Sequence, residues 1–107
     1  MLKANNRIKS KGHLKFVSKY KCALDEFADF ECNGVIQSHH LLKPYDGVRG
    51  MGMKASDNNA VPLCQFHHHK LHFVKGNEDK FWVDYGLTED FGREVAKHLW
   101  SISPFNK

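Results

Sequence analysis

The chain has 107 residues, a formal net charge of +4, and 41% hydrophobic and 26% charged residues. These values indicate one small globular domain. They exclude a membrane protein, because no apolar run approaches the roughly 18 residues of a span, and the basic N-terminus lacks the apolar stretch of a signal peptide. We therefore expect a cytoplasmic protein without a membrane partner.

The basic residues are concentrated at the N-terminus. Residues 1–24 contain no acidic side chain, whereas the rest of the chain is net negative. We predict a mobile or extended basic arm over residues 1–12, because this stretch has no apolar period. Such an arm suits a polyanion, most commonly a phosphate backbone, and the alternative is a solvated or partly disordered tail. The candidate nucleic-acid contacts are Lys9, Lys11, Lys15 and Lys19.

The first half of the remaining chain indicates short elements. Residues 13–20 are predicted to form a short helix or strand. Cys32, Asn33 and Gly34 supply a turn into a strand over residues 35–40. A loop over residues 41–56, rich in glycine, leads to a second strand over residues 60–63, in which Pro62 indicates a sheet edge or a strand end.

The second half is predicted to be helical. A helix over residues 65–75 would end at Gly76 as its C-cap. Asn77 is expected to cap a short helix that stops at Gly86, and Thr88 to cap a last helix that ends near Pro104. The aromatic side chains of these helices are expected in the core: Phe81, Trp82, Tyr85, Phe91 and Trp100.

Histidines gather in two places. The segment Cys64–His72 contains four of the eight histidines, and His39 and His40 are adjacent upstream. Neutral imidazoles in a core each need a hydrogen-bond partner, so a metal explains this density better than packing does. On a helix, His68 and His72 share one face, whereas His67 points about 100° away. One helix could therefore serve two metal centres.

The strand ending in two histidines, the second strand and the histidine-bearing helix together resemble the HNH nuclease family. The residues that carry the resemblance are His39, His40, Asn59, Cys64, His67, His68 and His72, and a narrower resemblance is to the phage and prophage branch that includes RecA-dependent recombination nucleases. The resemblance implies an α+β fold with a zinc-stapled ββα-metal core. It divides the domain of residues 13–107 into a zinc knuckle (13–34), the core (35–76) and C-terminal helices (77–107).

The resemblance also implies roles. His39, His68 and His72 would hold one divalent ion, and His40 would be the general base. Three imidazoles leave positions open on the ion, as a catalytic centre requires, although an inert zinc is the alternative. The group that orients His40 would be Asn59. Relatives tend to lack this asparagine, so Asp57 or Asn58 are the alternates.

A second centre is predicted from the three cysteines. Cys22, Cys32, Cys64 and His67 supply the ligands of a closed tetrahedral zinc, which would stabilise a small core. The two upstream cysteines are farther apart than in relatives, which an insertion in the knuckle loop would explain. Three buried free thiols are the alternative.

We therefore expect a metal-dependent endonuclease that hydrolyses DNA, nicking one strand as a monomer, encoded by a phage or its bacterial host. The catalytic ion could be Mn, Mg, Ni, Co or Zn, with Mg least suited to imidazole ligands. A recombinase filament or another phage or host protein is a possible partner. The alternative function is a zinc-stapled nucleic-acid-binding module without catalysis.

Overall fold

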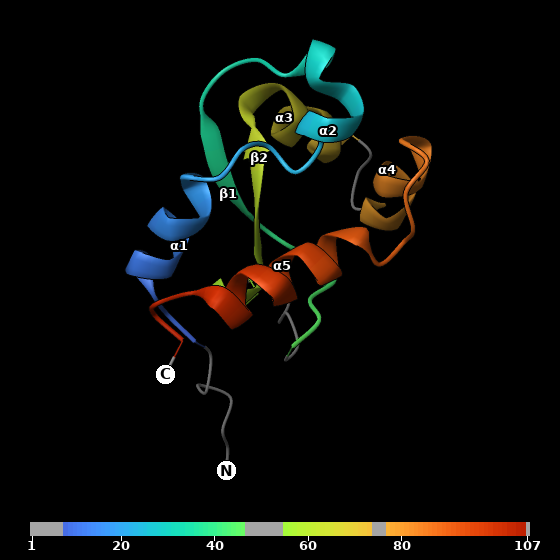
Figure 1. Cartoon of the computed structure of the whole chain (residues 1–107). Coiled ribbons are helices and arrows are strands. Elements are labelled where there is room, and N and C mark those ends of the chain that lie inside the picture. The colour runs from blue at the N-terminus through green and yellow to red at the C-terminus, as the bar shows by residue number, and fades with distance from the viewer. Residues whose placement is uncertain (1–7, 47–54, 74–76, 107) are drawn as a thin grey trace.

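The computed structural model describes residues 8–46, 55–73 and 77–106 (Figure 1). Its elements, in chain order, are α1 (Lys11–Ser18), α2 (Asp25–Ala28), the 3-10 helix η2 (Asp29–Glu31), β1 (Ile36–His40), the 3-10 helix η3 (Asp57–Asn59), β2 (Ala60–Cys64), α3 (Gln65–Phe73), α4 (Glu78–Asp84) and α5 (Phe91–Ile102). The α+β class expected from the sequence is confirmed. None of the helices in these residues has the length and apolarity to cross a bilayer.

The two predicted strands form an antiparallel pair. Ile36 lies opposite Cys64, and His40 lies opposite Ala60. Since side chains alternate along a strand, His39 and its partner Val61 share one face, and His40 and Ala60 share the other. Both strands are edges of this two-stranded sheet, so a proline fits in β2.

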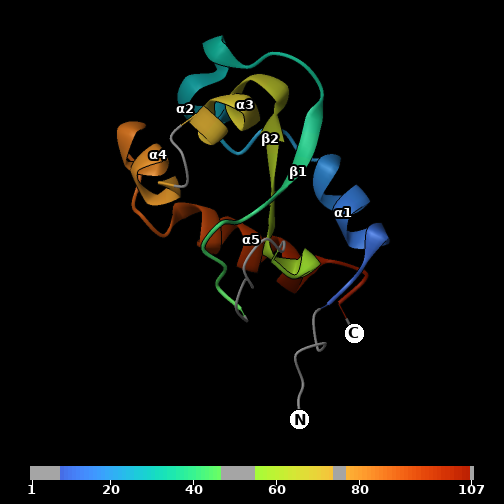
Figure 2. The same ribbon diagram turned by 180° about the vertical axis from the view of Figure 1, so that it is seen from behind.

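Helices cover both faces of the strand pair. On the Ala60 face, Val17 of α1 and Leu99 of α5 form a small buried cluster. On the Val61 face, Leu71 of α3 and Trp82 of α4 belong to a larger cluster. In Figure 1, α5 crosses in front of the strands, and in Figure 2, seen from behind, it lies behind them. The side chains of the two adjacent histidines of β1 thus leave the strand on opposite faces of the sheet.

Helix α1 begins earlier than the sequence suggested. The side chain of Ser10 accepts a hydrogen bond from the backbone N–H of His13, which makes Ser10 the N-cap and brings Lys11 and Gly12 into the helix. The arm predicted over residues 1–12 is therefore wrong at its end, and residues 1–7 lie outside the described residues.

The helices after the strands largely follow the prediction. The Asn77 side chain accepts the N–H of Lys80 and caps α4, which ends before Gly86, a residue with φ of 81°. Helix α3 is described as far as Phe73, and the predicted C-cap at Gly76 falls outside the described residues. Helix α5 begins at Phe91, so Thr88 does not cap it with its side chain.

The aromatic core was predicted only in part. Phe81 and Trp82 are buried, whereas Tyr85 and Phe91 are half-buried against the same cluster. Trp100 packs edge-on against His13, with ring centroids 4.8 Å apart.

Candidate metal centres and the histidine between strand and loop

Three imidazoles meet between β1 and α3. His39 from β1 and His68 and His72 from α3 each offer a ring nitrogen within 4.8 Å of the others. The Nε2 atoms of His68 and His72 are 3.2 Å apart. Two nitrogens on one ion, with metal–nitrogen bonds of about 2.0–2.1 Å, lie about 2.8–3.4 Å apart in octahedral or tetrahedral geometry. The spacing of this cluster, which the sequence predicted, therefore fits one ion.

Two neighbours hold these rings. Oε1 of Gln37 lies 2.5 Å from Nδ1 of His68, so this ring donates through Nδ1 and keeps the Nε2 lone pair for the cluster. Nε2 of His39 lies 2.7 Å from Oε2 of Glu78. Neither neighbour was predicted from the sequence.

The environment favours neutral imidazoles. Burial, then the nearby His39, His72 and His40, lower the pKa of His68 to about 4. Burial and the neighbouring His39 also lower the pKa of His72, against an opposing effect of Glu78. Both rings are therefore neutral near pH 7, which is the form that binds a metal ion.

His40 is held by an aspartate. Its Nε2 lies 2.8 Å from Oδ1 of Asp57, and its side chain is 15% exposed. It is not one of the three clustered imidazoles, yet it is close enough to His68 to contribute to the lowered pKa of that ring. A fourth imidazole and a candidate ion site are thus neighbours.

Asn59, predicted to orient His40, does not do so. Its Oδ1 accepts the backbone N–H groups of Tyr45 and Asp46, at 2.9 and 3.2 Å, and its Nδ2 donates to the carbonyl of Asp46. Asn58 also turns to this loop and donates to the hydroxyl of Tyr45. The two asparagines fix the chain after β1, and the alternate Asp57 occupies the orienting position.

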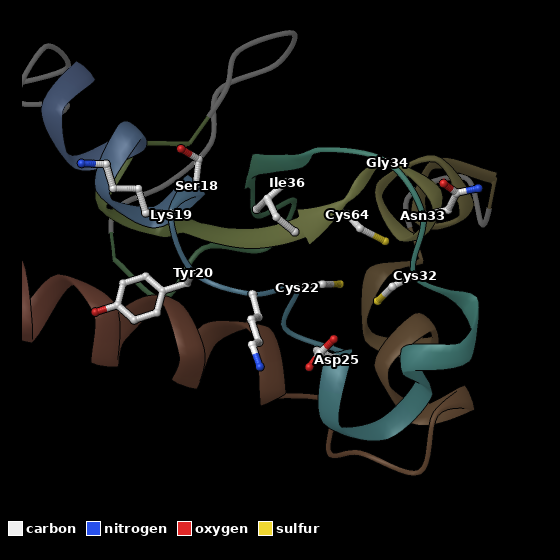
Figure 3. Close-up of a pocket in the computed structure, with 11 residues that line it drawn as sticks. Ser18, Lys19, Tyr20, Cys22, Asp25, Cys32, Asn33, Gly34, Ile36 and Cys64 are labelled. Carbon is white, nitrogen blue, oxygen red and sulfur yellow. The ribbon is translucent and has the colours of Figure 1, made fainter.

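The second predicted cluster is also assembled. Nδ1 of His67 lies 3.5 Å from Sγ of Cys22, 3.6 Å from that of Cys32 and 3.2 Å from that of Cys64. In a tetrahedral zinc site with the usual bond lengths, sulfur and nitrogen lie about 3.6 Å apart. The cluster could therefore hold a metal ion. Figure 3 shows the three sulfur atoms at one end of an open pocket of about 570 Å³.

The carboxylate of Glu31 supports this cluster of cysteines and His67. Oε1 of Glu31 lies 3.1 Å from Nε2 of His67 and accepts the hydroxyl of Tyr85, while Nζ of Lys70 lies 3.6 Å from Oε2. Glu31 comes from η2, in the long stretch between the first two cysteines, for which the sequence predicted no helix. The extra residues therefore place Glu31 against His67.

The thiols differ in how their thiolates are supported. Burial raises the pKa of Cys22 and raises that of Cys32 to about 12. At Cys64 burial acts in the same direction, yet backbone N–H groups of His67 and Asn33 lower the pKa. A bound cation would supply the positive charge that favours all three thiolates.

The turn that begins β1 depends on glycine. Gly34 has φ of 89°, and a Cβ there would lie 2.5 Å from Cβ of Gln65. This close approach lets the carbonyl of Asn33 accept the N–H of Phe66, which ties the turn to the start of α3.

The predicted nucleic-acid contacts are exposed. Lys11, Lys15 and Lys19 follow at intervals of four residues along α1 and its C-cap, opposite the buried His13 and Val17, and Lys9 precedes the helix. Of the remaining histidines, His69 and His98 are exposed. His13 is fully buried.

The fold and these clusters define a small α+β protein with two candidate metal centres. The chain belongs to the family described as Protein of unknown function (DUF968), whose model matches residues 2–95. Searches among curated proteins and among solved structures found no match.

Proposed function

We propose that the protein is a metal-dependent endonuclease of the HNH type that hydrolyses DNA phosphodiester bonds, with β1, β2 and α3 as its ββα-metal unit. One observation carries the proposal: the cluster of His39, His68 and His72 lies beside a fourth histidine that is held by Asp57. A purely structural metal centre has no use for that fourth histidine.

The proposed division of labour follows from these contacts. A divalent ion held by the three imidazoles would stabilise negative charge on the phosphate and leaving oxygens. When His40 donates Nε2–H to Asp57, its Nδ1 keeps a lone pair. His40 can then accept the proton of an attacking water as general base.

The cluster of Cys22, Cys32, Cys64 and His67 would hold a structural zinc. Four protein ligands close the coordination shell, so this centre would stabilise the fold rather than bind substrate. It would join the segment between α1 and β1 to the first turn of α3, from which His68 also projects.

DNA is the proposed substrate because the exposed lysines of α1 suit a phosphate backbone. The same lysines, together with a closed zinc centre, favour the second candidate, a nucleic-acid-binding module without catalysis. A partner such as a recombinase filament is compatible with either function. His40 distinguishes the two candidates, because only the nuclease uses it.

The test is the variant His40→Ala, assayed by plasmid nicking with Mn, Mg, Ni, Co and Zn added singly after mild chelation. We expect wild-type nicking with at least one ion, and a loss of about 10²-fold or more in the variant, with metal content and DNA binding retained. His98→Ala, at an exposed position on α5, is the matched control. Nicking by His40→Ala at the wild-type rate would refute the mechanism, and DNA binding by the wild type without nicking with any ion would support the binding module.

A further inference from the structure

Glu78 reaches the imidazole cluster from another part of the chain. It lies in the first turn of α4, 39 residues after His39, and the two side chains are 1% and 2% exposed. Oε2 of Glu78 and Nε2 of His39 are 2.7 Å apart. The contact is therefore a short hydrogen bond that is shielded from water.

The other partners of this carboxylate are also donors. The backbone N–H of Leu42 donates to both oxygens, at 3.1 and 3.2 Å, and that of Lys43 donates to Oε1 at 3.4 Å. A carboxylate has only acceptor atoms, so the His39 nitrogen that faces it must donate a hydrogen bond, as the two backbone N–H groups do. His39 thus carries its proton on Nε2 and keeps the lone pair of Nδ1 for an ion.

Capping of α4 does not explain the burial of Glu78. Asn77 already caps this helix through its own side chain. In the described part of the chain, Glu78 has His39 as its ion-pair partner and no lysine or arginine. Burying a carboxylate is costly unless it is paired and hydrogen-bonded, and among the described residues this pairing is with His39. A divalent cation at the imidazole cluster would add the positive charge that a buried carboxylate favours.

We propose that Glu78 is a positioning residue of the imidazole ion site, which fixes the tautomer and ring orientation of His39 and supplies the negative charge that a divalent cation balances. This inference rests on the proposed function in one respect, namely that the three imidazoles bind the working ion. Carboxylates behind ligating histidines typically contribute about 10-fold to 100-fold in metal affinity or activity.

The experiment measures ion affinity rather than cleavage. The full chain is first loaded with zinc at the cysteine centre, and Co²⁺ is then titrated in while its visible absorption is recorded, with no sulfur-to-cobalt charge-transfer band expected. The variants are Glu78→Ala, which removes both charge and hydrogen bond, and Glu78→Gln, which keeps an acceptor for His39. Asp79→Asn is the matched control, because Asp79 is the next residue in α4 and binds Lys43 and Arg93 instead.

We expect Glu78→Ala to weaken Co²⁺ binding by about 10-fold to 100-fold, Glu78→Gln to weaken it less, and Asp79→Asn to leave it unchanged. Unchanged affinity in a folded Glu78→Ala variant would overturn the proposal. If Glu78→Ala fails to fold, Glu78→Gln provides the test. A Glu78→Gln variant with the Co²⁺ affinity and absorption of the wild type would overturn the proposal.

Plasmid nicking by the wild type is assayed in parallel. A wild type that binds Co²⁺ at the imidazoles but never nicks would refute the nuclease and leave the role of Glu78 standing. A wild type that binds no Co²⁺ there would overturn both.

Discussion

The carboxylate of Asp57 joins two segments: Oδ1 lies 2.8 Å from Nε2 of His40, and Oδ2 accepts the backbone N–H of Ser10 at 2.7 Å. The N–H of Asp57 also donates to the carbonyl of Ile8, whose own N–H donates to the hydroxyl of Ser56. The start of α1 is thereby bonded to the residue that orients His40. Asp57 is thus hydrogen-bonded both to the N-cap of the basic helix α1 and to the proposed general base, His40.

The variant Asp57→Asn should cut DNA more slowly, by roughly 10²-fold or more, because an amide can donate to Nε2 of His40 and hold the wrong tautomer. The measurement is kcat for plasmid nicking, together with metal content, which should not change. Asn59→Ser serves as the comparison, since it loosens the loop at Tyr45. This variant should have a lower Tm, with little change in kcat. Equal cutting by Asp57→Asn and wild type would contradict the assigned role.

The variant Cys22→Ser should lose zinc and stability together, because one of four ligands is removed from a centre that supports a small core. We expect one zinc fewer per chain and a Tm lower by about 20 °C or more. Glu31→Gln should retain zinc but bind it about 10-fold to 100-fold more weakly. Thermal unfolding and elemental analysis check both, and a Cys22→Ser variant with wild-type Tm and zinc content would disprove the structural role.

Replacement of Lys11, Lys15 and Lys19 by glutamine should weaken DNA binding without changing nucleotide sequence preference, because contacts to phosphate carry no sequence information. The slope of log K against log salt should become shallower by about 0.9 for each phosphate that a lysine no longer neutralises. Fluorescence anisotropy at several salt concentrations measures this slope. Lys97→Gln, exposed on α5, is the control, and an unchanged slope in the triple variant would exclude α1 from the DNA interface.

Stability should fall in mild acid because of His13. Burial lowers the pKa of this ring from 6.5, against an opposing effect of Asp57. Below about pH 6.5 the unfolded chain takes up a proton that the folded chain refuses, so the free energy of unfolding decreases as the pH falls toward the folded pKa. His13→Phe removes the titration and the buried Nε2, which has no hydrogen-bond partner among the described residues.

Urea unfolding at pH 7.5 and pH 5.5, with zinc in excess, tests this prediction. The loss of stability between the two values should be smaller in His13→Phe than in wild type. The hydrogen bond between His13 and Ser103 is absent from His13→Phe at both pH values, so its loss does not affect the difference. An identical pH dependence in the two proteins would show that His13 does not contribute.

The histidines of both clusters, and Cys64, were predictable because they lie in regular elements with recognisable spacing. His68 and His72 are one helical turn apart, and Cys64 and His67 span the start of the same helix. Strand alternation likewise separated His39 from His40. These patterns are local, so the sequence displays them directly.

The supporting carboxylates could not be found in this way. Glu31 and Glu78 lie 36 and 39 residues from the histidines that they hold, and a glutamate in the first turn of a helix has an ordinary local explanation. Asn59 was wrong for a related reason: its side chain binds the loop at Tyr45, a pairing that depends on how that loop folds back. The N-cap at Ser10 was missed because the residues that follow it, Lys11 and Gly12, do not begin an apolar period.

Strand β1 also limits where this protein can change in length. His39 and His40 are adjacent, so inserting or deleting a single residue between Ile36 and His39 would carry each ring to the opposite face of the sheet. Each ring would then leave its own carboxylate, and with it the position that the proposed mechanism requires. Within the strand, changes in length are compatible with the proposed chemistry only in steps of two.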